Sequence, residues 1–352
     1  MKAIRRPLLA WYRRVRRDLP WRRTGDPYAI WVSETMLQQT RVETVIPYYE
    51  RFLARFPDVF ALADATADDV MEHWAGLGYY RRARMLHEAA RVVAREQGGR
   101  LPESAEALRE LPGVGSYTAG AVASIAFDRP EPVLDGNVIR VLARLLDLRE
   151  DVGSAAVRRR LLEEARALAR GPDPGDLNQA LMELGATLCT PRAPQCGACP
   201  VARACRGRAA GEQGRLPVKA PRRSPRPVRA MASWIERRGR VLAVRRPPEG
   251  LLGGLWELPG AELGAGESAE AGAARTLQER LGLEVEHAQP LGRVHHVFSH
   301  RVLELEVLRV RVAPGRVRRH GFDAHRFCSR RALRALPLSS VARKAIELAA
   351  EA

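Results

Sequence analysis

Lysine is nearly absent from this sequence of 352 residues. Lys2, Lys219 and Lys344 are the only lysines among 58 basic side chains, and the other 55 are arginines. Schiff-base catalysis needs a lysine amine that attacks a carbonyl carbon. The stretch between Lys2 and Lys219 contains no lysine, so no residue within it can catalyse a reaction in this way. The excess of arginine is not itself a functional signal, since a GC-rich coding sequence would produce the same bias.

Long apolar runs and a dispersed set of cysteines are also missing. The stretch from Ala119 to Phe127 is among the longest apolar runs, far short of the roughly 20 residues that cross a bilayer. The basic N-terminus has no continuous apolar core and no small-residue cleavage site, so it does not resemble a signal peptide. Four of the five cysteines fall between positions 189 and 205, which excludes a secreted disulfide framework. We therefore expect a cytoplasmic protein with no membrane association.

Charge and length indicate a two-domain protein with a polyanionic partner. Hydrophobic residues make up 46% of the chain, enough for a sizeable core, and the length favours two domains over one. The formal net charge of +17 points to nucleic acid first and to an anionic membrane surface second.

The pattern of apolar residues divides the chain into three parts. Residues 1–205 show the three- and four-residue spacing of helices, residues 206–229 are rich in Arg, Pro and Gly and are predicted to be a linker, and residues 230–352 mix strands with helices. The fold class is therefore multidomain, with an all-α first domain and an α+β second domain. The predicted helices of the first domain are Pro27–Tyr49, Ala67–Trp74, Arg81–Gln97, Ser104–Leu111 and Asn137–Leu148.

The second domain is predicted to begin with two short strands and to contain a longer strand and a helix. Met231–Ile235 and Val241–Val244 flank a charged turn, and Val302–Val312 alternates apolar with charged residues, which is typical of half-buried strands. Residues 268–281 form a helical pattern, with Ser268 as its N-cap and Gly282 just beyond its end.

The clustered cysteines predict a metal site with four thiolate ligands. Their spacing is C-x6-C-x2-C-x5-C, and four thiolates suit either tetrahedral zinc or a [4Fe–4S] cluster. The spacing lacks the two C-x2-C pairs of zinc ribbons, which favours the cluster. The predicted ligands are Cys189, Cys196, Cys199 and Cys205, and Cys328 is expected to be a buried thiol.

A glycine-containing turn between two helical stretches predicts contact with a phosphate backbone. Leu111-Pro-Gly-Val-Gly115 is followed by a helix that opens with Ser116. Gly113 and Gly115 permit close approach of the backbone, and the free N–H groups of the next helix bind phosphate without a basic side chain. This is the pattern of a helix–hairpin–helix that binds DNA without sequence preference, a turn that also accommodates a monovalent cation.

Two acidic residues are candidates for acid–base chemistry. Glu34 lies on a largely apolar helix, where burial would raise its pKa and keep it protonated. Asp135 is placed to cap the helix that begins after it, whatever else it does. Cleavage of a glycosidic bond requires two carboxylates, one to donate a proton and one to stabilise the sugar cation.

Taken together, these segments resemble the adenine DNA glycosylases of the MutY type, within the helix–hairpin–helix superfamily that includes endonuclease III. The resemblance rests on W-V-S-E-x-M-L-Q-Q-T from Trp31, G-L-G-Y-Y-x-R-A-R at 76–84, the glycine turn, L-D-G-N-V at 134–138 and the cysteine loop. It implies hydrolysis of the N-glycosidic bond of adenine mispaired with 8-oxoguanine or guanine in double-stranded DNA, by a monomer with a [4Fe–4S] cluster that acts at the nucleoid.

The resemblance also implies roles for individual residues. Glu34 corresponds to the acid that protonates adenine and Asp135 to the carboxylate that stabilises the sugar cation, supported by Tyr117 and Asn137. The other implied contacts are Arg22 and Glu183 with the extruded adenine, and Gln39, Thr40, Tyr79, Gly113, Gly115 and Ser116 with DNA. Bifunctional members of the superfamily carry a catalytic lysine where this chain has Tyr117, so a monofunctional enzyme that uses water is expected.

The second domain resembles a Nudix hydrolase whose metal site has been lost. Thr276 and Arg280 stand where the Nudix pattern has glutamates that bind magnesium, so pyrophosphohydrolase activity is not expected. By resemblance, Phe298, Ser299 and His300 form the loop that recognises 8-oxoguanine.

Three other functions remain open on the sequence. One is a glycosylase of the same fold that removes thymine or uracil opposite guanine, one is a non-catalytic iron–sulfur DNA-binding protein, and one is a Nudix nucleotide hydrolase with a DNA-binding appendage. The Nudix-like domain and the 298–300 loop disfavour the first, Glu34 and Asp135 the second, and the altered Nudix helix the third.

Overall fold

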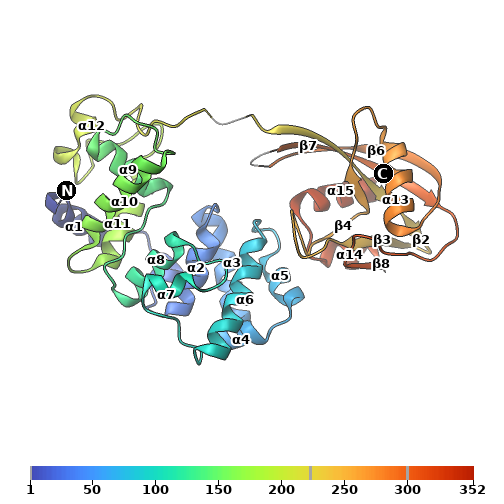
Figure 1. Cartoon of the computed structure of the whole chain (residues 1–352), viewed down its shortest axis with the longest axis horizontal. Helices are drawn as coiled ribbons and strands as arrows, with labels where there is room; N and C mark the ends of the chain where they lie inside the picture. The colour runs from blue at the N-terminus through green and yellow to red at the C-terminus, as the bar shows by residue number, and fades with distance from the viewer. Residues whose placement is uncertain (1, 222–223, 299–300) are drawn as a thin grey trace. The chain divides into compact units, whose positions relative to one another are not determined.

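The computed structural model describes residues 2–221, 224–298 and 301–352 (Figure 1). The chain forms two compact units: unit 1 comprises Met1–Ala65 and Met85–Arg222, and unit 2 comprises Thr66–Arg84 and Arg223–Ala352. Within the described ranges, no helix is long and apolar enough to span a membrane.

Unit 1 is helical, as the spacing of apolar residues predicts. Its helices are α1 (Arg5–Val15), α2 (Pro27–Leu37), α3 (Val42–Arg55), α4 (Val59–Asp64), α6 (Arg81–Glu96, shared with unit 2), α7 (Ala105–Arg109), α8 (Ser116–Phe127), α9 (Gly136–Leu146), α10 (Ala155–Ala169), α11 (Pro174–Thr187) and α12 (Arg206–Ala209), with short 3-10 turns η1 (Lys2–Ile4), η2 (Pro20–Arg22) and η3 (Ala202–Ala204).

One predicted helix is two helices in the structure. The expected helix Pro27–Tyr49 breaks after Leu37, and the chain turns through Gln39, whose φ of 62° lies in the left-handed region. The amide of Thr40 closes the turn on the carbonyl of Leu37 at 3.3 Å. Apolar spacing does not detect this break, because the turn occupies only residues 38–41 and the apolar pattern resumes in α3.

The core around α9 and α11 brings distant segments together. Helix α11 packs closely on α9 at Gly185, where an added Cβ would lie 2.5 Å from Cβ of Asn137. The same core includes apolar residues of α1 and α10, and Cys189, Cys199 and Cys205 pack against it. The N-terminus of α9 and the cysteine loop are therefore parts of one packed body.

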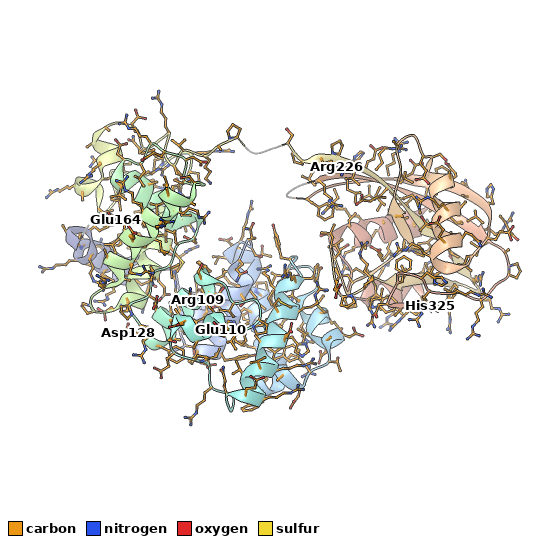
Figure 2. All side chains as sticks on the ribbon, in the orientation of Figure 1. Arg109, Glu110, Asp128, Glu164, Arg226 and His325 are labelled. Atoms are coloured by element: carbon orange, nitrogen blue, oxygen red, sulfur yellow. The ribbon has the colours of Figure 1, made fainter. Side chains whose placement is uncertain are left out.

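Residues 206–220 pack on unit 1, although their composition predicts a linker. Leu216 is 3% exposed, and its carbonyl accepts a hydrogen bond from Nε of Arg144 at 3.0 Å. The amide of Val152 donates to the carbonyl of Val218 at 3.1 Å. Strand β1 then begins at Arg226, which Figure 2 labels at the start of that strand. Composition does not reveal these contacts, because the segment has few apolar residues and docks mainly through backbone hydrogen bonds.

Unit 2 is an α+β fold with two sheets. One sheet has the order β5-β1-β7-β6, with β1 and β7 parallel, and in the other β3 pairs with β2, β4 and β8. The strands are β1 (Arg226–Trp234), β2 (Glu236–Arg237), β3 (Arg240–Arg245), β4 (Trp256–Glu257), β5 (Gly260–Glu262), β6 (Val285–Val297), β7 (Arg301–Val312) and β8 (Ala324–Cys328), and the helices are α5 (Ala67–Trp74), α13 (Ala269–Leu281), α14 (Arg330–Ala335) and α15 (Ser340–Glu351).

Alternation along β1 places helices on opposite faces of the first sheet. Ala230 and Trp234 pack in the core that contains α15, whereas Met231 packs in the core that contains α13. As predicted, Ser268 caps α13, accepting a hydrogen bond from the amide of Ala271, and Gly282 follows the helix in the left-handed conformation.

Candidate active site and cysteine loop

Glu34 is buried on α2, in the position expected of a general acid. It is 5% exposed, and the Tyr117 hydroxyl donates a hydrogen bond to its Oε2 at 2.8 Å. The pKa of Glu34 is raised to about 7, chiefly by burial and also by the charge of Asp135, against the hydrogen bond from Tyr117 and the charge of Arg22, which lower it. The carboxyl group is thus held partly protonated near neutral pH.

Asp135 caps α9 as its position in the sequence predicts. Its Oδ1 accepts from the amide of Val138 at 2.7 Å, and its Oδ2 accepts from Nδ2 of Asn137 at 2.9 Å. Burial raises the pKa of Asp135, and the hydrogen bonds from Val138 and Asn137 oppose that shift. Since the charge of Asp135 acts on the pKa of Glu34, the structure brings the two predicted carboxyl groups into one site.

Tyr117 occupies the second position of α8 and faces the carboxyl groups. Besides its hydrogen bond to Glu34, its hydroxyl lies 3.5 Å from Sδ of Met182. Burial raises the pKa of Tyr117 well above its ordinary value, and the charges of Glu34 and Asp135 raise it further. The phenol therefore stays protonated and acts as a hydrogen-bond donor.

A buried ion-pair network joins the two residues expected to contact adenine. Glu183 on α11 is 2% exposed, and its Oε2 lies 2.8 Å from Nη2 of Arg22. Burial acts to raise the pKa of Glu183, but hydrogen bonds from Arg17 and Arg22 lower it to about 2. Arg22 also lies over the Tyr12 ring, 5.4 Å from its centroid.

Arg17 is a member of this network that sequence reasoning missed. Its Nε lies 2.7 Å from Oε1 of Glu183, and its Nη2 lies 2.9 Å from Oε2. Two features of the sequence point to such a partner. A carboxylate buried among helices requires cationic partners, and the N-terminal segment is rich in arginine. Composition alone did not indicate which arginine it would be.

A chain of hydrogen bonds connects Asp135 to the cysteine loop. Asn137, which donates to Asp135, accepts from Nη2 of Arg140 at 2.8 Å through its Oδ1. Nε of Arg140 donates to the carbonyl of Cys189 at 2.7 Å, and Nη2 donates to that of Gly185 at 2.7 Å. Arg140 was not singled out from the sequence, although it lies one helical turn beyond the predicted N-cap.

Arg144 holds the start of the cysteine loop from inside the core. It is 1% exposed, and its Nη1 donates to the carbonyl of Thr190 at 2.7 Å and to Sγ of Cys189 at 3.3 Å. Its Nη2 donates to the carbonyl of Pro191 at 3.1 Å. Because the buried guanidinium on α9 donates hydrogen bonds to the carbonyls at the start of the cysteine loop, it fixes the first cysteine relative to α9.

The thiols of the cysteine loop influence one another electrostatically and have the chemistry of metal ligands. The pKa of Cys199 is raised to about 11, chiefly by burial and also by the charges of the other three cysteines. Burial likewise raises the pKa of Cys205. Such thiols ionise readily only beside a cation, so the donor set fits a thiolate-bound centre. In the ranges that the structure describes, no group of three or more His, Cys, Asp or Glu side chains has the arrangement of a site for a metal ion.

The predicted glycine turn joins α7 to α8. Gly113 has a φ of +74°, and a Cβ at this position would lie 2.3 Å from Cβ of Met85. Gly115 is the N-cap of α8, and a Cβ there would meet nothing within 4 Å. The turn therefore presents a smooth backbone surface at the N-terminus of α8, beginning at Ser116.

The remaining predicted DNA contacts lie at turns. Gln39 is exposed and Thr40 half-buried in the turn between α2 and α3. Tyr79 is 50% exposed with a φ of 49°, so it is not a core aromatic. The guanidinium of Arg82 lies over its ring at 5.3 Å, in the segment that clusters with unit 2.

In unit 2, the side chains at the altered Nudix positions are buried or engaged within the protein. Thr276 is fully buried, and Arg280 donates to the carbonyl of Gly321 at 2.7 Å. Glu267 pairs with Arg275 at 2.8 Å. Phe298 lies at the end of the β6–β7 hairpin, with its ring 4.5 Å from that of His296. Ser299 and His300 lie outside the described residues.

Two protein-family models match the chain, one in each part. Residues 32–167 match a model described as HhH-GPD superfamily base excision DNA repair protein. Residues 230–348 match a model described as NUDIX domain. Both domain types expected from the sequence are thus confirmed.

Curated relatives match both parts at once. The chain is 42% identical to an adenine DNA glycosylase of Rattus norvegicus over 87% of this chain and 70% of the relative. It is 32% identical to that of Schizosaccharomyces pombe over 85% of this chain and 80% of the relative. Among solved structures, a thermostable thymine-DNA glycosylase is 31% identical with a TM-score of 0.53, covering 59% of this chain and 96% of that protein.

The similarity to the curated relatives extends through the HhH-GPD domain and the NUDIX domain in the same order. On this ground the chain belongs to the family of adenine DNA glycosylases, specifically the MutY-type members that carry a C-terminal NUDIX domain.

Proposed function

We propose that this protein is a monofunctional DNA glycosylase that removes adenine mispaired with 8-oxoguanine or guanine from double-stranded DNA. The observation that carries the proposal is the buried Glu34 carboxyl, which accepts a hydrogen bond from Tyr117 and whose pKa is raised by the charge of Asp135, itself hydrogen-bonded by Asn137. The substrate follows from membership of the family.

In the proposed reaction, Glu34 donates its proton to the adenine ring. The bond between the base and the sugar carbon then breaks, its electron pair leaves with adenine, and a cation develops on the sugar. The carboxylate of Asp135 stabilises that cation until water adds to the carbon and loses a proton. The base must first leave the helical stack, because the bond is inaccessible inside it.

Arg22 and Glu183 are proposed to contact the extruded adenine. Glu183 stays ionised next to Arg17 and Arg22, and it offers hydrogen-bond acceptors to the amino group of the base. The ion-pair network fixes both side chains before the base arrives, which lowers the entropic cost of binding.

The proposed DNA contacts combine backbone groups with side chains at turns. Gly113, Gly115 and Ser116 would bind a phosphate, together with a monovalent cation at the turn, and Gln39, Thr40 and Tyr79 would contact the duplex near the lesion. Phe298, Ser299 and His300 are proposed to recognise 8-oxoguanine. The functional divisions are 1–205, 206–229 and 230–352, in a monomer that acts at the nucleoid of the cytoplasm.

A [4Fe–4S] cluster is proposed as the resident cofactor, held by Cys189, Cys196, Cys199 and Cys205. When bound, the cluster would cross-link the four cysteines and so make the loop rigid. Arg192, Arg203 and Arg206 on and beside that loop would then face a phosphate backbone. The thiols of Cys199 and Cys205, whose burial disfavours ionisation, support a centre of metal cations that would stabilise thiolates.

Excision of thymine or uracil opposite guanine is a second candidate, because the solved structure of a thymine-DNA glycosylase shares the fold of unit 1. The test is to incubate the protein with duplexes that carry adenine, thymine or uracil opposite 8-oxoguanine or guanine, and then to cleave abasic sites with alkali. Strand breaks at adenine alone support the proposal. Breaks at thymine or uracil, or breaks without alkali, would contradict it.

A further inference from the structure

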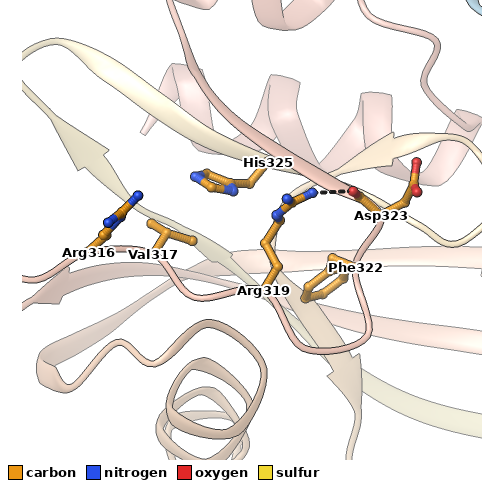
Figure 3. A pocket seen from close by; sticks show the side chains of 6 residues that line it. All are labelled: Arg316, Val317, Arg319, Phe322, Asp323 and His325. Atoms are coloured by element: carbon orange, nitrogen blue, oxygen red, sulfur yellow. Dashed lines mark hydrogen bonds between the residues drawn. The ribbon is translucent and has the colours of Figure 1, made fainter.

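A cavity of about 670 Å³ lies in unit 2, and none of its lining residues belongs to the 298–300 loop or to the site of Glu34. Figure 3 shows the side chains that line it, with His325 drawn between the guanidinium groups of Arg316 and Arg319. The volume falls within the roughly 300–1,000 Å³ of sites that bind small molecules. The lining residues are Arg316, Val317, Arg319, Phe322, Asp323 and His325.

The charged groups of this cavity leave a net positive site. Asp323 is its only acid, and that carboxylate is paired with Nη2 of Arg245 at 2.6 Å. Arg319 donates to the backbone carbonyl of Asp323, which orients its guanidinium. In the part of the chain that the structure describes, neither Arg316 nor Arg319 forms an ion pair with a carboxylate. Two arginines are therefore available to an anion.

His325 adds a neutral polar group to the same wall. Its Nδ1 is buried and has no hydrogen-bond partner within the described residues. Burial and the nearby charge of Arg319 both lower the pKa of His325, so the ring is neutral at pH 7. A buried ring nitrogen without a partner is costly, and a ligand that hydrogen-bonds to the ring would relieve that cost.

The lining of the cavity is mainly polar, and its smaller apolar part consists of Val317 and Phe322. Phe322 is 6% exposed, and the guanidinium of Arg280 lies 3.7 Å from the centroid of its ring. Arg280 also donates to the carbonyl of Gly321, which fixes the loop beneath the ring. Arg280 stands where the Nudix pattern has a glutamate that binds magnesium. The positive charge at this end of α13 is therefore the guanidinium of Arg280 and not a magnesium ion.

The cavity lies far from the hairpin expected to recognise the lesion. Strand β7 runs from that hairpin to Val312, and its 12 residues span about 35 Å at roughly 3.3 Å per residue. At the far end, Arg237 donates to the carbonyls of Ala313 and Gly315 and anchors the loop that leads to Arg316. One base of a substrate therefore cannot occupy both places.

We propose that this cavity binds a small organic phosphate, of the size of a mononucleotide, without a divalent metal. The phosphate would lie between Arg316 and Arg319 with a hydrogen bond to His325, and the apolar part would rest against Phe322 and Val317. The backbone of a duplex would use the arginines but would leave the apolar wall without a partner. This inference goes beyond the proposed glycosylase function and is independent of it.

The test is calorimetric titration of the full-length, cluster-containing protein with AMP and with inorganic phosphate, in buffer free of divalent cations. AMP should bind, and inorganic phosphate should bind at least about fivefold more weakly because it lacks the apolar contact. The double variant Arg316→Ser/Arg319→Ser should lose at least about tenfold in affinity for AMP, since it removes both charged donors. Arg334→Ser, which removes an exposed arginine from α14, is the matched control and should bind as the wild type does.

The variant His325→Phe gives a second measurement, because it keeps a ring of similar size but removes the polar nitrogens. Weaker AMP binding is expected, with a melting temperature no lower than that of the wild type, because the substitution also removes the unpartnered buried nitrogen. Two results would overturn the proposal directly: no AMP binding at millimolar concentration, or AMP binding only when magnesium is added. A third would also overturn it: undamaged duplex DNA displaces AMP, and the double arginine variant loses as much affinity for the duplex as it loses for AMP. The last result would identify the cavity as a contact for the DNA backbone.

Discussion

Opposing influences on Glu34 set the pH range in which it can act as an acid. Burial raises its pKa and the hydrogen bond from Tyr117 lowers it by favouring the ionised form, so that the pKa stands at about 7. An acid must carry its proton when the base departs. The excision rate should therefore fall as the pH rises through the pKa of Glu34.

This balance predicts the effect of Tyr117→Phe. Loss of the hydroxyl removes a hydrogen bond to the carboxylate, so the pKa of Glu34 should rise and the falling limb of the pH–rate profile should move to higher pH. Single-turnover excision measured from about pH 6 to pH 9 would show the shift. Glu34→Gln serves as the control and should lose at least about a hundredfold in rate at every pH. A limb that moves to lower pH in Tyr117→Phe would contradict the assignment.

At the level of elements, the glycine turn offers a matched pair of substitutions. Gly113→Ala places a methyl group 2.3 Å from Cβ of Met85 and requires a positive φ, so it should destabilise unit 1 by roughly 1–3 kcal/mol. Gly115→Ala adds a methyl group that meets nothing in the protein, so stability should be unchanged. Both variants should weaken DNA binding. In Gly115→Ala the cause is only the methyl group that obstructs the phosphate, whereas in Gly113→Ala the loss of stability contributes as well. Thermal melting and duplex affinity, measured together, separate the two effects. Unchanged affinity in Gly115→Ala would remove that turn from the DNA interface.

Helix α9 carries a second prediction, because it connects the active site to the cysteine loop. Arg140→Gln would break the hydrogen bonds that run from Asn137 to the carbonyls of Cys189 and Gly185. Loss of a charge-assisted hydrogen bond is worth roughly 1.5–3 kcal/mol, so we expect about a tenfold slower excision step as Asp135 loses its support.

The control for Arg140→Gln is Arg13→Gln, which removes exposed ion pairs with Asp173 and Asp176. Exposed pairs contribute little, so this variant should retain the wild-type rate. Iron content and duplex affinity are measured alongside the rate. If Arg140→Gln keeps the wild-type excision rate at equal iron content, the hydrogen-bond chain does not support Asp135.

The ends of the helices were predictable from the sequence, whereas some turns and buried contacts were not. Asp135 and Ser268 were recognisable as N-caps, since a short polar side chain before an apolar pattern satisfies the first amides of a helix. The turn through Gln39 and the buried partnership of Arg17 with Glu183 were not predictable. The first depends on one residue adopting a positive φ, and the second depends on contacts between residues 166 positions apart.

At the scale of the whole molecule, positive charge is concentrated between the two family domains. Residues 1–205 carry +4, residues 206–229 carry +7 and residues 230–352 carry +6, which together give the net charge of +17. The charge of residues 206–229 follows directly from their composition. Composition could not predict that Leu216 is buried or that Val218 bonds to Val152, because these contacts depend on the surface of unit 1.

This concentration of charge predicts a salt-dependent contribution to DNA affinity. Arg222 and Arg223 lie outside the described residues, and Arg226 and Arg229 are exposed on β1. Replacing all four by serine should lower the slope of log affinity against log salt by up to about 3.6, at roughly 0.9 for each phosphate that an arginine no longer neutralises. Excision at saturating protein should be unchanged, because none of the four belongs to the site that holds the two carboxyl groups.

A charge-matched control uses four exposed arginines of the α10 region, Arg158, Arg159, Arg166 and Arg170, replaced by glutamine. If the segment between the domains contacts phosphates directly, its variant should flatten the salt dependence more than the α10 variant does. Equal slopes in the two variants would mean that the net charge of the molecule, and not the position of these arginines, determines the electrostatic part of DNA binding.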